Sequence, residues 1–370
     1  MGTPSSTTII RPRMPELDSL RGVAILLVVF YHGFFWSNNV TGLTGVGRLF
    51  VNATRFGWLG VNLFFVLSGF LITGILFDSK AQEHYFRRFY VRRALRILPA
   101  FYGLLLILLF IPSQSRAYLL LSFFYLSNLA SPLGIPMTYT MLWSLAVEEH
   151  FYFVWPVAVR ILSGRALMIC AAAIVCVEPF LRAWYFFRGW PEGSGYLTWL
   201  VADGLAMGAI LAMIVRLPQF TRKRLAMFVV GVLGVATSMA LFGARYGILT
   251  QRRLLGASLL LTVAQLFFLG ALGLTLFLGT GKWPRLVNIP ILQFFGEISY
   301  GLYLIHWLFF AGYDAIASKL WPSSHPASGK MTLLSLRFIC AAGLASIAAF
   351  LSRKYFEGPF LRLKNRWTAA

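Results

Sequence analysis

The sequence predicts an all-α protein that crosses a membrane many times, and two observations lead to this fold class. Hydrophobic residues make up 58% of the 370 positions and charged residues only 12%, whereas soluble domains have roughly 45–50% apolar and about 25% charged residues. The apolar residues form long blocks that are separated by basic loops. This pattern excludes an ordinary soluble enzyme, and we expect a polytopic membrane helix bundle.

The excess of basic residues fits either a nucleic-acid-binding protein or the cytoplasmic loops of a membrane protein. The positions of these residues in the sequence distinguish the two. A net charge of +21, from 33 Lys and Arg against 12 Asp and Glu, would by itself favour nucleic-acid binding. The basic residues lie between apolar blocks, as they do in cytoplasmic loops of membrane proteins, so we expect no nucleic-acid partner. Cys170, Cys176 and Cys340 fall inside apolar segments, where we expect helix packing and neither a disulfide framework nor a metal site.

Ten stretches of the sequence have the length of a transmembrane helix. Such a helix needs about 20 mostly apolar residues to cross about 30 Å of hydrocarbon. The predicted spans are residues 17–36, 57–77, 94–112, 141–161, 166–187, 196–215, 225–243, 254–278, 289–312 and 331–352. The first span follows basic residues but no small-residue cleavage site follows it closely, so we expect a retained anchor.

The run 118–129 is apolar but too short to cross comfortably. If it does not cross, 22 Lys and Arg lie on one face of the membrane and 9 on the other, whereas an eleventh crossing gives 15 and 16. Because cytoplasmic loops carry the excess of Lys and Arg, the sequence predicts ten spans, both termini in the cytoplasm, and a non-spanning or re-entrant segment near 118–129. The expected domains are a disordered N-terminus over 1–13, a transmembrane domain over 14–360 and a cytoplasmic tail over 361–370.

Ionisable residues inside the predicted spans are functional candidates, because each is costly in hydrocarbon and usually faces the bundle interior or a water-filled cavity. Arg21 and His32 are eleven residues apart, which places them within roughly 20° of one helix face and about 16 Å apart along the axis. Counting the helical rise places Glu148 at the depth of His32. A neutral imidazole oriented by a carboxylate is the usual general base near neutral pH, so we predict this role for His32; a structural polar network is the alternative.

Further polar residues are candidates for the site; Asp203 is predicted near the depth of Glu148, and His306 in the outer half of its span. Ser299, Tyr303 and His306 share a helical face, and with Glu149 and Asp203 they are candidates for an acceptor or oxyanion site. Asp203 precedes Gly204 and equally suits a helix junction. For Glu178 and Arg182, at i and i+4, we favour a local ion pair.

A cluster of arginines and a glycine-rich span are the remaining candidates. Arg92, Arg93 and Arg96 lie at the cytoplasmic end of the third span. Topology and anionic lipid headgroups explain such arginines, but arginine forks also bind phosphates of a soluble cofactor. Gly60, Gly69 and Gly74 favour close helix packing in the second span; a passage for a thin thioester-bearing arm, lined by Ser68, is the alternative.

The motifs in their order along the chain resemble those of the acyltransferase-3 family of bacterial integral-membrane acyltransferases. The matching segments are Glu16-Leu-Asp-Ser-Leu-Arg21-Gly with His32, Gly60-Val-Asn-Leu-Phe-Phe-Val-Leu-Ser-Gly-Phe70, Arg92-Arg-Ala-Leu-Arg-Ile-Leu-Pro99, Leu142-Trp-Ser-Leu-Ala-Val-Glu148-Glu149-His-Phe-Tyr-Phe-Val-Trp-Pro156, Asp203-Gly204 and Ser299-Tyr-Gly-Leu-Tyr-Leu-Ile-His306. Together they extend over about residues 14–360.

The resemblance implies an activity and roles for several residues. It implies transfer of an acyl group, often acetyl, from cytoplasmic acyl-CoA to a hydroxyl of an envelope glycan or lipid-linked sugar at the bacterial inner membrane, with acyl-CoA as co-substrate and no bound cofactor. Arg21 and His32 carry over as the essential pair, Glu148 as the acidic position, and Arg93 with Arg96 as the Arg-x-x-Arg motif. His150 stands where a Gln is commoner, which leaves its role open. Some relatives append an extracytoplasmic hydrolase-like domain; we expect this chain to act without one or with a separate partner.

Residue chemistry and resemblance together predict a transmembrane transfer. Acyl-CoA would bind Arg92, Arg93 and Arg96, and His32, oriented by Glu148, would deprotonate the acceptor hydroxyl, with an acyl-His32 intermediate as the variant. A backbone amide or Tyr303 would stabilise the oxyanion. Three alternatives remain open: a proton-coupled transporter or flippase of a glycan or lipid precursor, O-acylation of a hydrophobic small molecule such as a macrolide, and a non-catalytic scaffold.

Overall fold

The computed structural model describes residues 9–36, 43–189, 194–281, 283–320 and 330–368. Within these ranges every regular element is a helix, as the composition predicts. A helix overlaps each of the ten predicted spans. The helices are α1 (Pro15–Phe30) continued by the π-helical turn η1 (Tyr31–Trp36), α3 (Gly60–Ser79), α4 (Tyr85–Leu109), α6 (Leu142–Ile161), α7 (Gly164–Phe187), α8 (Asp203–Ile214), α9 (Arg222–Tyr246), α10 (Leu254–Gly279), α11 (Pro290–Leu320) and α12 (Lys330–Leu351).

Seven of these helical segments are long and apolar enough to cross a membrane by length and composition: Pro15–Trp36, Gly45–Ser79, Gly164–Phe187, Arg222–Tyr246, Leu254–Gly279, Pro290–Leu320 and Lys330–Leu363. The chain is therefore a multi-pass membrane protein. α4 and α6 reach the required length but are too polar or charged for the same criterion. α8 has 12 residues, about 18 Å at the helical rise, and is shorter than the predicted span 196–215. The count of ten spans thus remains a prediction.

Three further helices lie between or after the spans. α2 (Gly45–Thr54) precedes α3, separated from it by the short 3₁₀ turn η2 (Arg55–Leu59), and α13 (Gly358–Thr368) forms the tail. α5 (Arg116–Phe123) occupies the run 118–129 together with a 3₁₀ turn. Eight residues of α-helix cover about 12 Å, which is too short to cross the hydrocarbon and agrees with a non-spanning segment.

Local sequence signals explain where several helices begin and end. The side chains of Ser163 and Thr221 accept hydrogen bonds from the backbone amides of Ala166 and Arg224, and so cap the first turns of α7 and α9. Gly247 ends α9 in the left-handed region with φ of 87°.

The N-terminal segment differs from the prediction. Ile9 is 5% exposed and belongs to an apolar cluster with Leu17 and Leu276, and Arg11 forms an ion pair with the fully buried Glu16. Residues 9–13 are therefore ordered, because Ile9 and the buried carboxylate of Glu16 tie them to the bundle. The rest of the predicted disordered segment, residues 1–8, lies outside the described residues.

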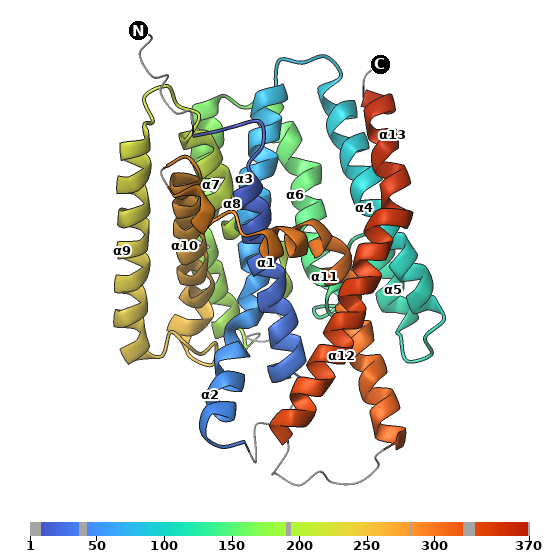
Figure 1. The fold of residues 1–370 in the computed structure, drawn as a ribbon. Helices are drawn as coiled ribbons and strands as arrows, with labels where there is room; N and C mark the ends of the chain where they lie inside the picture. The colour runs from blue at the N-terminus through green and yellow to red at the C-terminus, as the bar shows by residue number, and fades with distance from the viewer. Residues whose placement is uncertain (1–8, 37–42, 190–193, 282, 321–329, 369–370) are drawn as a thin grey trace.

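The helices are arranged around α1 and α3 (Figure 1). α1 packs against α11 and α3, and α3 packs against α8 and α6; α9 and α10 flank one side of this centre, and α11 and α12 the other. α2 lies at one end of the bundle, whereas α4 begins at the opposite end, where α13 finishes (Figure 1). The central helices therefore have α2 near one end, and the start of α4 and the end of α13 near the other (Figure 1).

Glycines permit two close backbone contacts at this centre. A Cβ atom at Gly69 of α3 would overlap the carbonyl oxygen of Leu205 in α8, and one at Gly208 of α8 would overlap that of Val66 in α3. The same reciprocal arrangement joins α1 and α11 through Gly22 and Gly296. Small residues are the usual means by which membrane helices approach so closely.

We expect Gly69→Ala to destabilise the protein by about 1–3 kcal/mol, because the added methyl group forces α3 and α8 apart. The measurement is the thermal unfolding midpoint in detergent. Gly231→Ala in α9 is the matched control, since nothing lies within 4 Å of its Cβ position, and it should leave the midpoint unchanged or raise it. Equal midpoints for both variants would show that the α3–α8 contact is not as close as described.

Candidate functional site

Two cavities penetrate the centre of the bundle. The first, the arginine cavity, is narrow, at about 100 Å³, and lies between α1, α3, α4, α6 and α11. Its lining includes Arg21, Ser68, Arg93, Arg96, Glu148, Glu149, Tyr152, Ser299 and Tyr303. The second, the histidine cavity, is wide, at about 720 Å³, and is lined by His32 with aromatic and polar side chains. Tyr303 and Val61 line both cavities, so the two cavities meet at these residues.

Glu148 is held rigidly in the arginine cavity. Its Oε1 accepts a hydrogen bond from the Ser68 hydroxyl at 2.9 Å, and its Oε2 accepts one from the Tyr152 hydroxyl at 3.0 Å. The Tyr152 ring in turn lies under the guanidinium of Arg93, 4.5 Å from the ring centre, a cation–π contact. Ser68 therefore lines the cavity as predicted, and it also fixes the carboxylate.

The arginines predicted to bind phosphate separate into two groups. Arg93 and Arg96 line the arginine cavity, whereas Arg92 is not among its lining residues. The reason is the helical repeat, since Arg92 and Arg96 are four residues apart and Arg92 lies a turn nearer the beginning of α4. Arg21 lines the same cavity from α1, with a hydrogen bond of 2.6 Å to Asp18. Three arginines thus surround the two glutamates, Glu148 and Glu149.

The histidine cavity combines aromatic and basic side chains. Its described lining contains no carboxylate; the residues are Tyr31, His32, Trp36, Arg55, Phe56, Trp58, Val61, Asn62, Thr140, Met141, Trp143, Phe186, Gly189, Gly195, Tyr196, Val201, Leu249, Thr250, Gln251, Arg252, Leu260, Leu261 and Tyr303. Arg55 and Arg252 are exposed and supply two positive charges. Such a wide space, lined by aromatic side chains together with polar ones, is typical of a binding site for an organic ligand.

His32 lies in the π-helical turn η1, where α1 changes its hydrogen-bond pattern; such turns are frequent at functional sites. Its Nδ1 lies 2.9 Å from the carbonyl oxygen of Val28. Because a carbonyl only accepts, Nδ1 carries the proton, and in the neutral ring Nε2 carries the lone pair. That is the nitrogen a base or nucleophile requires.

His306 of α11 supports this tautomer. Its Nδ1 donates to the carbonyl oxygens of Tyr303 and Leu302, at 2.8 and 3.0 Å, so its Nε2 is an acceptor. That Nε2 lies 3.3 Å from Nδ1 of His32. The proton on His32 Nδ1 is thus shared between Val28 and His306, and a second histidine orients the ring.

The prediction that Glu148 orients His32 is wrong. Glu148 bonds to Ser68 and Tyr152 in the arginine cavity, while His32 lines the other cavity and contacts His306. Tyr303, whose hydroxyl lies 2.6 Å from Ser144 Oγ, separates the two. Equal depth along two helices does not bring side chains together when the helices are not neighbours: α1 packs mainly on α11 and α3, whereas α6 packs on α3.

The other predicted acceptor-site residues have different positions. Ser299 lines the arginine cavity and donates to the carbonyl of Gly296 at 2.8 Å. Glu149 lines it as well, and its buried Oε1 has no hydrogen-bond partner among the described residues. Its carboxylate can therefore accept a hydrogen bond from a ligand in this cavity.

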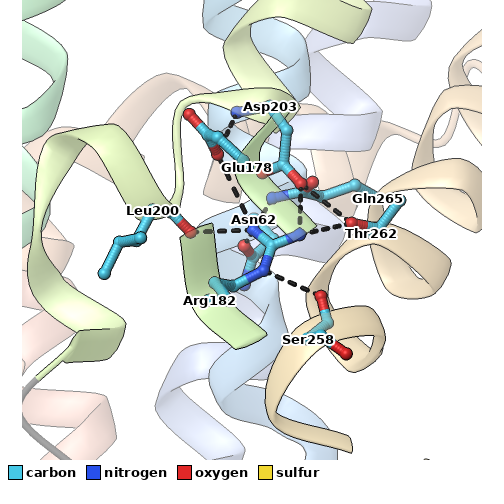
Figure 2. A network of polar contacts seen from close by, with 8 residues as sticks. All are labelled: Asn62, Glu178, Arg182, Leu200, Asp203, Ser258, Thr262 and Gln265. Atoms are coloured by element: carbon cyan, nitrogen blue, oxygen red, sulfur yellow. Dashed lines mark hydrogen bonds and ion pairs between the residues drawn. The ribbon is translucent and has the colours of Figure 1, made fainter. Parts of the chain in front are cut away.

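Asp203 belongs to a buried polar network (Figure 2). It lines neither cavity within the described part of the chain. Its Oδ2 accepts from Arg182 at 2.8 Å, and its amide donates to Glu178 at 2.9 Å. Glu178 and Arg182 form the predicted i,i+4 contact, at 3.6 Å. These buried charges pair with one another because hydrocarbon offers them no water, and they join α7 to the beginning of α8.

Several lining residues were not predicted. Tyr152 and Ser144 lie on α6 beside Glu148, at i+4 and i−4, and this spacing was the available signal. Asn62 lines the histidine cavity and accepts a hydrogen bond from Gln265 of α10 at 3.1 Å (Figure 2). Arg55 and Arg252 lie in loops far apart in the sequence, and no local pattern brings them to one cavity.

The comparisons with known proteins agree with this architecture. A family model described as an acyltransferase domain, that of the acyltransferase-3 family, matches residues 14–352. A Bacillus subtilis protein with the provisional name of peptidoglycan O-acetyltransferase is 32% identical over 238 residues, which is 57% of this chain and 35% of the relative. The peptidoglycan O-acetyltransferase of Listeria monocytogenes is 33% identical over 171 residues, or 41% of this chain and 25% of the relative.

A third relative aligns over more of the chain. A provisionally named O-acetyltransferase of Staphylococcus aureus is 26% identical over 381 aligned positions, 94% of this chain and 57% of the relative. The chain thus spans about a quarter to just over half the length of these relatives. No solved structure matches the chain.

The two cavities predict opposite accessibility. With the three native cysteines replaced by alanine, we expect Leu71→Cys in the arginine cavity to react with a membrane-impermeant maleimide from the face on which α4 begins. Gln251→Cys in the histidine cavity should react from the opposite face. Phe101→Cys, at a position 1% exposed, is the unreactive control. Labelling of both cavity positions from one face would contradict the arrangement.

Proposed function

Because the chain belongs to the acyltransferase-3 family, we propose that it is a membrane-embedded O-acyltransferase that moves an acyl group from cytoplasmic acyl-CoA to a hydroxyl of an envelope glycan or its lipid-linked precursor. The observation that carries this proposal is the meeting of two chemically different cavities at Tyr303. One cavity suits an anionic donor with a thin arm. The other suits a larger organic acceptor and contains the candidate base.

The arginine cavity supports acyl-CoA as the donor. Arg93 and Arg96 offer guanidinium forks that match phosphate geometry, and Arg92 is exposed one turn nearer the beginning of α4. The narrow volume of about 100 Å³ favours a short acyl group such as acetyl over a long chain. Glu148, fixed by Ser68 and Tyr152, and Glu149 can accept hydrogen bonds from the amide groups of the pantetheine arm.

The chemical step follows from the tautomer of His32. The acceptor hydroxyl oxygen attacks the thioester carbonyl; a C–O bond forms, the C–S bond breaks, and CoA leaves as a thiolate. Nε2 of His32 takes the hydroxyl proton, while its Nδ1–H stays bonded to Val28 and His306. Transfer through an acyl-His32 intermediate uses the same nitrogen. Tyr303, between the cavities, is the candidate donor to the oxyanion.

The histidine cavity supports a glycan acceptor. Trp36, Trp58 and Trp143 provide flat apolar faces, and Asn62 provides an amide, a combination that suits the apolar faces and hydroxyl groups of sugars. Arg55 and Arg252, without a carboxylate in the described lining, favour an acceptor that carries a carboxylate or phosphate. The names of two relatives, peptidoglycan O-acetyltransferases, agree with such an acceptor. The proposed location is the bacterial inner membrane, with the arginine cavity facing the cytoplasm.

Replacement of His32 should abolish transfer. With protein in nanodiscs, acetyl-CoA labelled in the acetyl group and an envelope glycan extract, we expect His32→Ala to lower the transfer rate by about 10²–10⁴-fold, the usual effect of losing a general base. CoA binding should persist, because His32 does not line the arginine cavity. The measurement is label on the acceptor by mass spectrometry, together with free CoA.

Two results would overturn the proposal. Full transfer by His32→Ala would exclude His32 as base or nucleophile. If no acyl-CoA binds or turns over and the protein instead moves an unmodified glycan or lipid across the bilayer, the protein is a transporter or flippase.

The arginines of the donor cavity should affect donor binding selectively. We expect Arg93→Gln and Arg96→Gln to raise the KM for acetyl-CoA about tenfold or more, because each removes a charge-assisted bond to phosphate of about 1.5–3 kcal/mol. The KM for the acceptor should stay the same. Arg224→Gln is the control, since Arg224 is exposed at the start of α9 and lines neither cavity. An unchanged donor KM in both cavity variants would refute phosphate binding here.

A further inference from the structure

Arg337 is a buried arginine for which the transfer mechanism provides no role. It lies in α12 with a side chain 6% exposed, and its Nε and Nη2 bind the two carboxylate oxygens of Asp314 in α11 at 2.6 and 2.7 Å. Its Nη1 donates to the carbonyl oxygen of Gly33 at 2.6 Å. Gly33 is the residue after His32, in the π-helical turn η1. One guanidinium thus ties the turn that carries His32 to both α11 and α12.

Aromatic contacts enclose the same turn. The Arg337 guanidinium lies 4.7 Å from the centre of the Phe310 ring. A Cβ atom at Gly33 would overlap the Phe338 ring and lie 3.0 Å from Phe310, so a larger residue here would have to displace the Phe338 ring. Phe338 also packs on Phe34, with ring centres 4.6 Å apart. These contacts restrict movement of the turn toward α11 and α12.

The contacts from α11 follow one another along a single face. His306, Phe310 and Asp314 are spaced by four residues, and positions at this spacing lie one above another on a helix. His306 contacts the ring of His32, Phe310 packs beneath the guanidinium, and Asp314 holds the guanidinium fork. The imidazole of His32 and the backbone of the turn η1 are therefore both held in place by contacts from α11.

We propose that Arg337, held by Asp314, is a positioning residue that fixes the π-helical turn at Gly33 and thereby aims Nε2 of His32 into the histidine cavity. The proposal rests on the proposed function, in which that nitrogen acts on the acceptor hydroxyl. A misplacement of about 1 Å in a reacting group can lower a rate about 100-fold. The arginine fork matters beyond its charge, because a lysine cannot bind both carboxylate oxygens and a third acceptor in this geometry.

The chain contains a matched control. Arg216 binds both oxygens of Asp78 at 2.8 Å and donates to the carbonyl of Ala212 at 3.0 Å. It thus makes the same three kinds of contact, and it lines neither cavity among the described residues. Arg216→Gln should therefore lose comparable stability without moving His32.

We expect Arg337→Gln to lower kcat by about 10–100-fold with the KM for acetyl-CoA unchanged, and Arg337→Lys to recover part of the loss. Asp314→Asn, at a half-exposed position, should lower kcat less and should fold. Arg216→Gln should keep the wild-type kcat. A second readout does not depend on turnover: the rate at which diethyl pyrocarbonate modifies His32, followed by mass spectrometry, should change in the Arg337 and Asp314 variants and not in Arg216→Gln.

The proposal would be overturned if Arg337→Gln kept both the wild-type kcat and the wild-type rate of His32 modification. If Arg337→Gln does not fold, the same result in Asp314→Asn would overturn it. Loss of activity matched by Arg216→Gln at the same loss of thermal stability would do the same, because it would show a purely structural effect. If the wild-type protein lacks acyl transfer altogether, the proposed function fails, and the modification rate still tests the positioning of His32.

Discussion

Charged and polar side chains inside this bundle are stabilised mainly by partners within the protein, because the hydrocarbon around the bundle offers none. The rest of the architecture depends on this constraint. Arg182 pairs with Asp203 and Glu178, Arg337 pairs with Asp314, and Glu148 is bound by Ser68 and Tyr152. Each set joins different helices, so the charges act as cross-links between α7 and α8, α11 and α12, and α3 and α6. The groups that remain accessible to ligands line the two cavities.

Tyr303 links the two cavities, because it lines both of them. Its ring belongs to α11, the same helix that supplies His306 beside His32 and Ser299 beside the glutamates. One helix therefore fixes the position of the arginine cavity relative to the histidine cavity. The glycine contact between α1 and α11 brings their backbones close, which keeps His32 within reach of this helix. Packing and proposed chemistry thus depend on the same pair of helices.

The helices could be predicted from the sequence, whereas the neighbours of each side chain could not. Run length and hydrophobicity predicted a helix within each of the ten segments, although α8 covers only part of the segment 196–215 and α11 extends to Leu320, beyond the predicted end at 312. The helical rise placed His32, Glu148 and His306 at similar depths, but depth leaves the order of helices around the bundle undetermined. That order puts His306, and not Glu148, beside His32. The interruption of α1 by a π-helical turn has no signal in the apolar pattern.

The central claim is that donor and acceptor reach Tyr303 from opposite faces of the membrane. The most direct test uses proteoliposomes in which the protein is oriented with the arginine cavity outward and the glycan acceptor is sealed inside. Labelled acetyl-CoA is then added only outside. We expect acetylated acceptor in the lumen and free CoA in the outer solution, and we expect His32→Ala to produce neither. Acetylation only of acceptor that is added to the outer solution would contradict it.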